Sequence, residues 1–142
     1  MRLSANNILE TKITAVKEGL VNAEIEMQML GGQKLTSIIT LTSARRLDLQ
    51  VDKIAFAIFK ASNVLIAESC GEISARNVIP CKVSVVNRGK VNTEISLDAG
   101  GQTITSIITL ESSKNLGIDL DGNKSVYAII KASDIIVGVP DE

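Results

Sequence analysis

The sequence predicts an all-β protein made of two tandem small β-barrels, each with one short helix. Three observations lead to this fold class. The sequence contains an internal repeat of two similar halves. Most segments are rich in β-branched residues or alternate apolar with polar side chains, and each repeat has a single short helical segment. Five or so short strands with one helix are typical of a closed or partly open barrel of the OB type, so the prediction is two OB-like barrels.

The internal repeat divides the 142 residues into two lobes. We expect a first domain at residues 1–67, a linker at 68–72 and a second domain at 73–142. The matching segments keep the same order along the chain: Ser4–Asn7 and Ser74–Asn77, Gly19–Glu24 and Gly89–Glu94, Gly31–Thr40 and Gly100–Thr109, Lys60–Val64 and Lys131–Ile135. Their register slips only in turn-like sequence, as a duplicated fold tolerates. Whatever one lobe does is therefore expected to occur twice.

Strands are expected where apolar and polar side chains alternate or β-branched residues gather, at residues 13–16, 23–29, 54–59, 82–86, 93–97 and 126–130. Glycine, asparagine and charged residues predict turns at 17–19, 31–33, 87–89, 99–101 and 120–123. One helix per lobe is expected at residues 42–47 and 111–116, where a serine or threonine can cap the first turn.

Composition indicates how the lobes are stabilised. Hydrophobic residues make up 45% of the chain with only two Phe and one Tyr, so the core is expected to be Ile, Val, Leu and Ala. Phe56, Phe59 and Tyr127 lie in apolar runs and are interpreted as core residues. Lobes this small bury a limited core and are marginal alone, so we expect association between lobes and between chains.

Charge and hydropathy bear on partners and location. The net charge is −1 with scattered Lys and Arg, which predicts no nucleic-acid partner. No signal peptide and no apolar run long enough to cross a bilayer are seen, so we expect no membrane partner and a cytoplasmic location. A disulfide between Cys70 and Cys81 stays open, and free thiols are the favoured interpretation in that compartment.

No catalytic constellation is visible in the sequence. Histidine is absent, which removes the commonest general base and metal ligand, and two cysteines without histidine do not make a standard zinc site. The two Gly-Gly pairs lie between alternating segments and are explained as hairpin turns. We therefore expect a protein that is not an enzyme, with no cofactor and no direct metal ligands.

A set of hydroxyl, amide and cationic residues does repeat, and such donors suit an oxyanion. The candidate oxyanion-binding residues are Ser4, Asn6, Thr40, Ser43, Lys60, Ala61, Ser74, Arg76, Thr109, Ser112, Lys131 and Ala132. Taken singly, each has a structural interpretation as a helix cap, a solvated strand end or a strand entry. Taken together in both repeats, they favour a binding site. Val21, Asn22, Val91 and Asn92 are interpreted from the residues alone as turn positions.

In this order, the repeated segments resemble the molbindins, small molybdate- and tungstate-binding proteins built from Mop domains. The resemblance spans nearly the whole chain and is specific to the tandem, two-domain form. It implies OB-like barrels, a cytoplasmic store of molybdate or tungstate, and no cofactor other than that ligand. It also implies a homotrimer in which six domains pack together, with oxyanion sites at domain and subunit interfaces.

The resemblance also implies roles for the candidate residues. Ser74 and Arg76 would donate from one domain, while a neighbouring domain would supply Thr109, Ser112, Lys131 and the backbone N–H of Ala132. The first repeat offers its own set in the same roles, and a second type of site would use Val21, Asn22, Val91 and Asn92. Asn6 stands where the second repeat has Arg76, so sites built on Asn6 are predicted to be weaker.

Two other functions stay open at this stage. An anion-sensing regulatory or interaction module would act in trans on a transporter or a regulator. A single-stranded nucleic-acid module with an OB fold is disfavoured by the acidic charge and by the near absence of aromatic residues.

Overall fold

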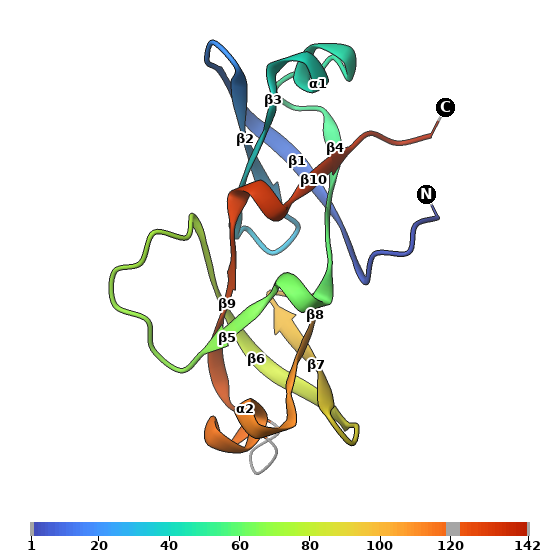
Figure 1. The fold of residues 1–142 in the computed structure, drawn as a ribbon. Helices are drawn as coiled ribbons and strands as arrows, with labels where there is room; N and C mark the ends of the chain where they lie inside the picture. The colour runs from blue at the N-terminus through green and yellow to red at the C-terminus, as the bar shows by residue number, and fades with distance from the viewer. Residues whose placement is uncertain (1, 119–122, 142) are drawn as a thin grey trace.

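The computed structural model of the protein describes residues 2–118 and 123–141. Two five-stranded antiparallel sheets, each strongly curved, are stacked along the long axis of the molecule (Figure 1). The predicted all-β class with OB-like barrels is confirmed. Each lobe also carries one short α-helix within the described residues, as predicted. The turn expected at residues 120–123 falls largely on residues 119–122, which lie outside the described part.

The elements of the first repeat are β1 (Asn7–Glu18), β2 (Asn22–Met29), β3 (Lys34–Thr40), α1 (Leu41–Arg46), β4 (Ile54–Phe59), the 3-10 turn η1 (Ala61–Asn63) and β5 (Leu65–Ala67). The second repeat gives β6 (Asn77–Arg88), β7 (Asn92–Ala99), β8 (Gln102–Thr109), α2 (Leu110–Asn115), β9 (Ser125–Ile130), η3 (Ala132–Asp134) and β10 (Ile136–Gly138). All six predicted strands are present, and β1 and β6 are longer than expected because each continues through a β-bulge.

The two repeats exchange their last strands. The sheet order is β10-β4-β1-β2-β3 in one lobe and β5-β9-β6-β7-β8 in the other. β5 of the first repeat pairs with β9, and β10 of the second repeat pairs with β4 (Figure 1). Each barrel is thus completed by a strand from the other repeat, which ties the lobes to each other.

The core follows the alternation of side chains along the strands. In β1 the buried positions are Asn7, Leu9, Thr11 and Ile13, and the residues between them face outward. Phe59 is buried, as predicted. Phe56 and Tyr127 are only half-buried, which corrects their assignment to the core: both lie on the outer face of their strands, opposite the fully buried Ala55, Ala57, Val126 and Ala128.

Two buried asparagines join the lobes. The Asn77 side chain accepts a hydrogen bond from Thr36 N at 2.7 Å and donates to Thr36 O at 2.8 Å. Asn7 does the same with Thr105, at 2.7 and 2.9 Å. A primary amide has the same donor and acceptor as a peptide group, so each asparagine extends the edge of β3 or β8 as one more backbone unit.

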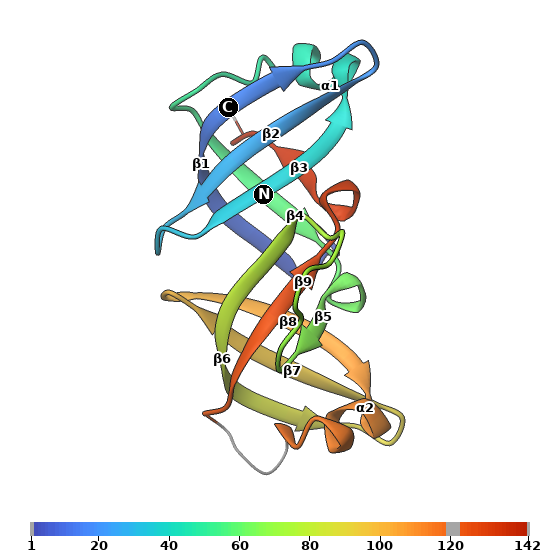
Figure 2. The ribbon, with the colours of Figure 1, turned by 90° about the vertical axis from the view of Figure 1, so that its left-hand side faces the viewer.

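Two buried serines complete this junction. Ser37 Oγ donates to Ile135 O at 2.6 Å, and Ser106 Oγ donates to Val64 O at 2.7 Å. Each hydroxyl therefore satisfies a carbonyl at the C-terminal end of a 3-10 turn of the other repeat. The four contacts repeat with near-identical geometry in the two lobes, so the junction has a pseudo-twofold arrangement (Figure 2).

Candidate functional site

Four of the predicted residues line one cleft of about 660 Å³: Ser74, Arg76, Lys131 and Ala132. The ladder between β6 and β9 ends at the pair Asn77–Ile130, so Arg76 and Lys131 leave that ladder side by side. Ser74 lies in the segment that enters β6, and Ala132 opens η3. The sheet register thus brings two cations and a hydroxyl together.

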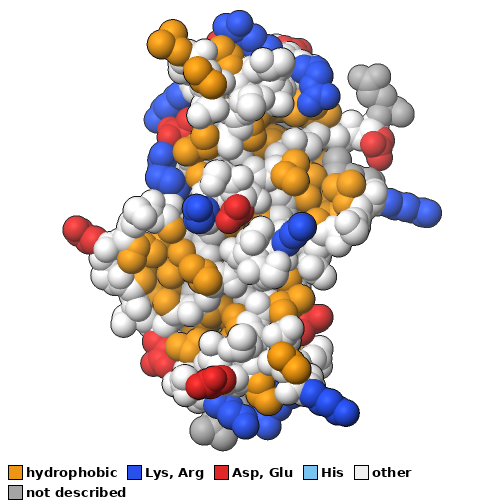
Figure 3. Space-filling view, in the orientation of Figure 1, with side chains coloured by type: hydrophobic (Ala, Val, Ile, Leu, Met, Phe, Trp, Pro, Cys, Tyr) orange, Lys and Arg blue, Asp and Glu red, His pale blue; other side chains and the backbone are white. Residues whose placement is uncertain are grey.

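The cleft has apolar walls and no acidic lining residue. Leu65, Ile73 and Ile129 form its apolar part, and Leu65 and Ile73 are exposed. Figure 3 shows hydrophobic side chains gathered on the left of that view, over β5, β9 and the loop between β5 and β6. Lys131 forms no ion pair among the described residues. A weakly hydrated wall beside two cations favours a compact anion.

The corresponding residues of the first repeat lie in the same way. The ladder between β1 and β4 ends at Asn7–Phe59, so Asn6 and Lys60 leave it side by side. Ala61 opens η1 and is fully buried, while Ser4 is exposed. Because Asn6 replaces Arg76, this end of the ladder carries one cation instead of two.

Arg76 reaches across the junction to the first lobe. Its Nη1 lies 2.6 Å from Glu24 Oε1 on β2, and Glu24 faces Ile38 of β3, which also lines the cleft. Glu24 Oε2 is 3.8 Å from Lys17 Nζ, which itself is 2.9 Å from Glu26 Oε1. The hydrogen bond from Arg76 holds the pKa of Glu24 below its usual value and the pKa of Arg76 above its own.

The helix-start residues lie at the two ends of the molecule, where α1 and α2 sit (Figure 1 and Figure 2). Thr40 Oγ1 accepts a hydrogen bond from Ser43 N at 3.1 Å and donates to Ser43 Oγ at 2.8 Å. Thr109 and Ser112 repeat this geometry. Both pairs therefore cap helices of six residues. Within one chain, the fold does not bring Thr109 and Ser112 to Ser74 and Arg76.

Thr40 lies nearer to the Arg76 cleft than Thr109 does. Ile38 and Thr40 stand on the same face of β3, two residues apart, so one strand repeat of about 7 Å separates them.

The four residues predicted for a second type of site also lie at the helix starts. Val21 O accepts from Leu41 N and Asn22 pairs with Thr40, while Val91 and Asn92 do the same with Leu110 and Thr109. Glu24 ends the repeated segment Gly19–Glu24, but the sequence does not predict its contact with Arg76, because it alternates with apolar residues like any solvated position of a strand.

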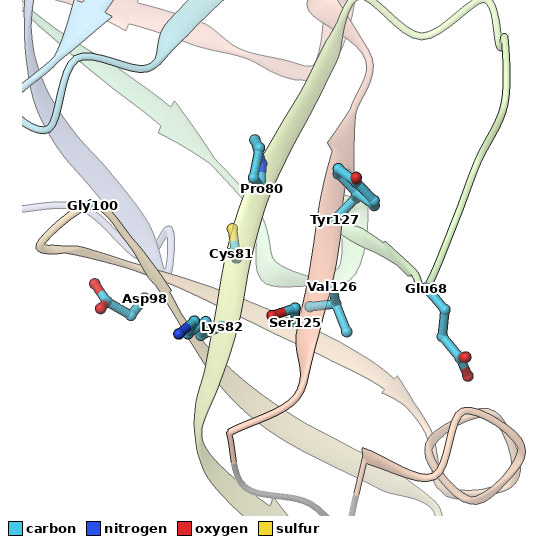
Figure 4. Close-up of a pocket in the computed structure, with 9 residues that line it drawn as sticks. All are labelled: Glu68, Pro80, Cys81, Lys82, Asp98, Gly100, Ser125, Val126 and Tyr127. Carbon is cyan, nitrogen blue, oxygen red and sulfur yellow. The ribbon is translucent and has the colours of Figure 1, made fainter.

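A different cleft, of about 510 Å³, is lined from β6, β9, the segment after β5 and the β7–β8 hairpin (Figure 4). It holds Glu68 and Asp98 with one cation, Lys82, and none of the predicted residues. Its acidic balance disfavours a dianion. Burial raises the pKa of the Cys81 thiol to about 11, so this cysteine stays protonated near neutral pH.

Other kinds of site receive no support from the described residues. Cys70 and Cys81 are both free cysteines. No group of three or more His, Cys, Asp or Glu side chains that could hold a metal ion occurs in the part of the chain that the structure describes. Among the same residues, no helix is long and apolar enough to cross a membrane.

The fold and the cleft define a class: a duplicated OB-like β-barrel protein with strand-end cations and hydroxyl groups gathered at the junction of its lobes. The family model of the TOBE domain matches the chain twice, at residues 3–66 and 73–137. The chain belongs to the TOBE domain family, as a tandem pair, and the resemblance to Mop domains is confirmed.

Relatives and a solved structure agree with this assignment. The molybdenum-pterin-binding protein MopA of Rhodobacter capsulatus is 40% identical over 99% of this chain and 53% of its own length. The molybdenum transport protein ModE of Azotobacter vinelandii is 30% identical over 98% of this chain and 52% of its own length. The chain spans about half the length of these curated relatives.

The structural similarity extends over the whole chain. The cytoplasmic molybdate-binding protein ModG, in a form with molybdate bound, superposes with a TM-score of 0.93 and 41% identity. The match covers 99% of this chain and 100% of that one.

Proposed function

We propose that the protein binds molybdate or tungstate as the oxyanion and serves as an intracellular store that buffers it. One observation carries this proposal: Ser74, Arg76 and Lys131 converge on one cleft, where Arg76 is paired with Glu24 and Lys131 forms no ion pair among the described residues. The similarity to ModG with molybdate bound, over the full length of both chains, supports the same ligand. The activity is binding and release without chemical conversion.

The chemistry of the donors suits a tetrahedral dianion. A guanidinium and an ammonium supply positive charge, and a hydroxyl and a backbone N–H add directional hydrogen bonds. Hydrogen bonds to charged groups each contribute about 1.5–3 kcal/mol, so a few converging donors replace the hydration shell of the anion. The metal is held through its oxygens, and no protein atom coordinates it directly.

We propose that the working unit is a homotrimer with sites at domain and subunit interfaces. Thr109 and Ser112 lie at the far end of the second lobe, so a site that combines them with Ser74 and Arg76 needs a second copy of the chain. Exposed apolar side chains next to the helix starts support such contacts: Leu20 is 99% exposed, and Val21 and Val91 are each 73% exposed. A cytoplasmic location and the absence of nucleic-acid and membrane partners belong to the same proposal.

Calorimetric titration of the purified protein with molybdate, tungstate and sulfate tests the function. We expect tight binding of the first two anions, more than one anion per chain, and little competition from excess sulfate. No heat from any of the three anions would overturn the proposal. Sedimentation of the same sample with and without molybdate measures the oligomeric state, and a monomer in both conditions would overturn the trimer.

A further inference from the structure

We propose that Glu24 lowers the affinity of the Arg76 site for its anion by competing for the guanidinium. Its carboxylate pairs with the Arg76 guanidinium, and an oxyanion that binds this guanidinium must displace it. This inference rests on the proposed function and deepens it, because it names an internal competitor of the ligand.

The contact between the two groups is direct. Arg76 Nη1 and Glu24 Oε1 are 2.6 Å apart, and the Glu24 side chain is 24% exposed against 45% for Arg76. The pair crosses the junction, from the segment before β6 to a position near the start of β2. Arg76 also lines the cleft that holds Ser74 and Lys131. The residue best placed to donate to an anion is therefore already engaged by a carboxylate of the other lobe.

A displaced Glu24 has a second cation beside it. Lys17 Nζ lies 3.8 Å from Glu24 Oε2, and its closer partner, at 2.9 Å, is Glu26 Oε1. When an anion takes the guanidinium, the Glu24 carboxylate can turn to Lys17 without being left unpaired. Exchange at Arg76 thus replaces one ion pair by another and does not strand a charge.

The corresponding glutamate of the second repeat does not have the charged partners that surround Glu24. Glu94 corresponds to Glu24, and it is exposed with no ion pair among the described residues. The charged residues around Glu24 have uncharged counterparts around Glu94: Asn6 for Arg76, Asn87 for Lys17 and Ser96 for Glu26. These three substitutions replace each of the charged partners that surround Glu24, so the competition is expected at the Arg76 site and not at the Asn6 site.

Competition by a carboxylate lowers the affinity for every anion by a similar amount. An anion binds Arg76 only after the ion pair with Glu24 is broken, and that cost does not depend on which anion replaces the carboxylate. Glu24 therefore weakens the binding of a monoanion and of a dianion by a similar factor, and any discrimination between them comes from their own attraction to Arg76 and Lys131.

The test compares Glu24→Gln with the matched control Glu94→Gln, by calorimetric titration with molybdate and with perrhenate, a tetrahedral monoanion. Glutamine keeps the shape and removes the charge. We expect Glu24→Gln to tighten the binding of both molybdate and perrhenate by a similar factor, on the order of threefold, which is the scale of an exposed ion pair. Glu94→Gln should leave both affinities unchanged. In an Arg76→Asn background, Glu24→Gln should have no effect on either anion.

The outcomes separate the two proposals. If the unmutated protein binds molybdate but Glu24→Gln leaves binding unchanged or weakens it, this inference is overturned and the proposed function stands. An equal effect of Glu24→Gln and Glu94→Gln would overturn it as well. If the unmutated protein binds neither molybdate nor tungstate, the proposed function itself fails. Glu24→Ala provides a second variant, and thermal unfolding of each variant confirms that it is folded.

Discussion

The two halves of the molecule share a backbone and differ in the side chains that lie over their junction. Asn7 and Asn77 make matching pairs of hydrogen bonds, and both helices begin with the same threonine cap. Arg76 with its Glu24 partner has no charged counterpart at Asn6. Duplication has thus preserved the contacts that hold the lobes together, while the charge at the two strand ends has diverged.

A second difference lies in the core. Thr11 and Cys81 occupy equivalent buried positions in β1 and β6. Thr11 Oγ1 donates to Ala55 O at 2.8 Å, whereas Cys81 Sγ lies 3.3 Å from Ile79 O in its own strand. A buried hydroxyl needs a hydrogen-bond acceptor, whereas a buried thiol packs like a small apolar group. The same buried position is therefore filled by a hydrogen-bonded side chain in the first lobe and by a thiol in the second.

The largest expected effect concerns the shared junction. Replacing Asn77 by alanine leaves Thr36 N and O without their partners in a largely buried place, so the free energy of unfolding should fall by about 3 kcal/mol. Asn7→Ala should cost somewhat less, because Asn77 also donates to Ile130 O at 3.2 Å. Urea denaturation measures both. Gln50→Ala, which removes an exposed amide, is the control, and an equal change in all three variants would contradict a role for the asparagines as junction residues.

The next effect concerns the charge difference between the lobes. Arg76→Asn makes the second repeat like the first, so molybdate binding at that site should weaken about tenfold through loss of a charge-assisted donor. Asn6→Arg should strengthen the first-repeat site. Titration calorimetry should resolve two classes of site in the unmutated protein and should find them merged in Arg76→Asn. Arg45→Asn, at an exposed arginine paired with Glu18, is the control and should change neither class.

The smallest effect concerns Cys81 and pH. Burial raises the pKa of its thiol from 9.0 to about 11, so the folded protein holds this proton more tightly than the unfolded chain. The contribution to stability is fully present below pH 9 and is lost as the pH rises towards 11. Cys81→Thr, which copies the first lobe, should flatten the fall in stability over that window in urea denaturation.

Alkylation provides an independent check on the same cysteine. At pH 8 iodoacetamide should label the partly exposed Cys70 much faster than the buried Cys81, and urea should equalise the two rates. Equal rates in the folded protein would show that Cys81 is accessible and that its thiol is not held protonated by burial.

Much of the fold could be predicted because its signals are local. The alternation in β1 and β2 identifies strands and their buried faces, and the helices begin one residue before the predicted starts, after Thr40 and Thr109. Part of the candidate site was predictable for the same reason, since Arg76 and Lys131 belong to repeated motifs that end a strand or begin one. Their convergence in one cleft follows from the β6–β9 register, which the motifs alone do not specify.

The duplication, the all-β class, the positions of most strands and the kinds of donor available can all be predicted from the order of the amino acids. Three features become visible only in the folded protein: β5 and β10 are exchanged, Asn7 and Asn77 act as extra backbone units, and Glu24 pairs with Arg76. The physical reason is that a period of two along a strand tells which face is buried, but not which strand lies beside it. Contacts between residues far apart in the chain depend on that choice of neighbour.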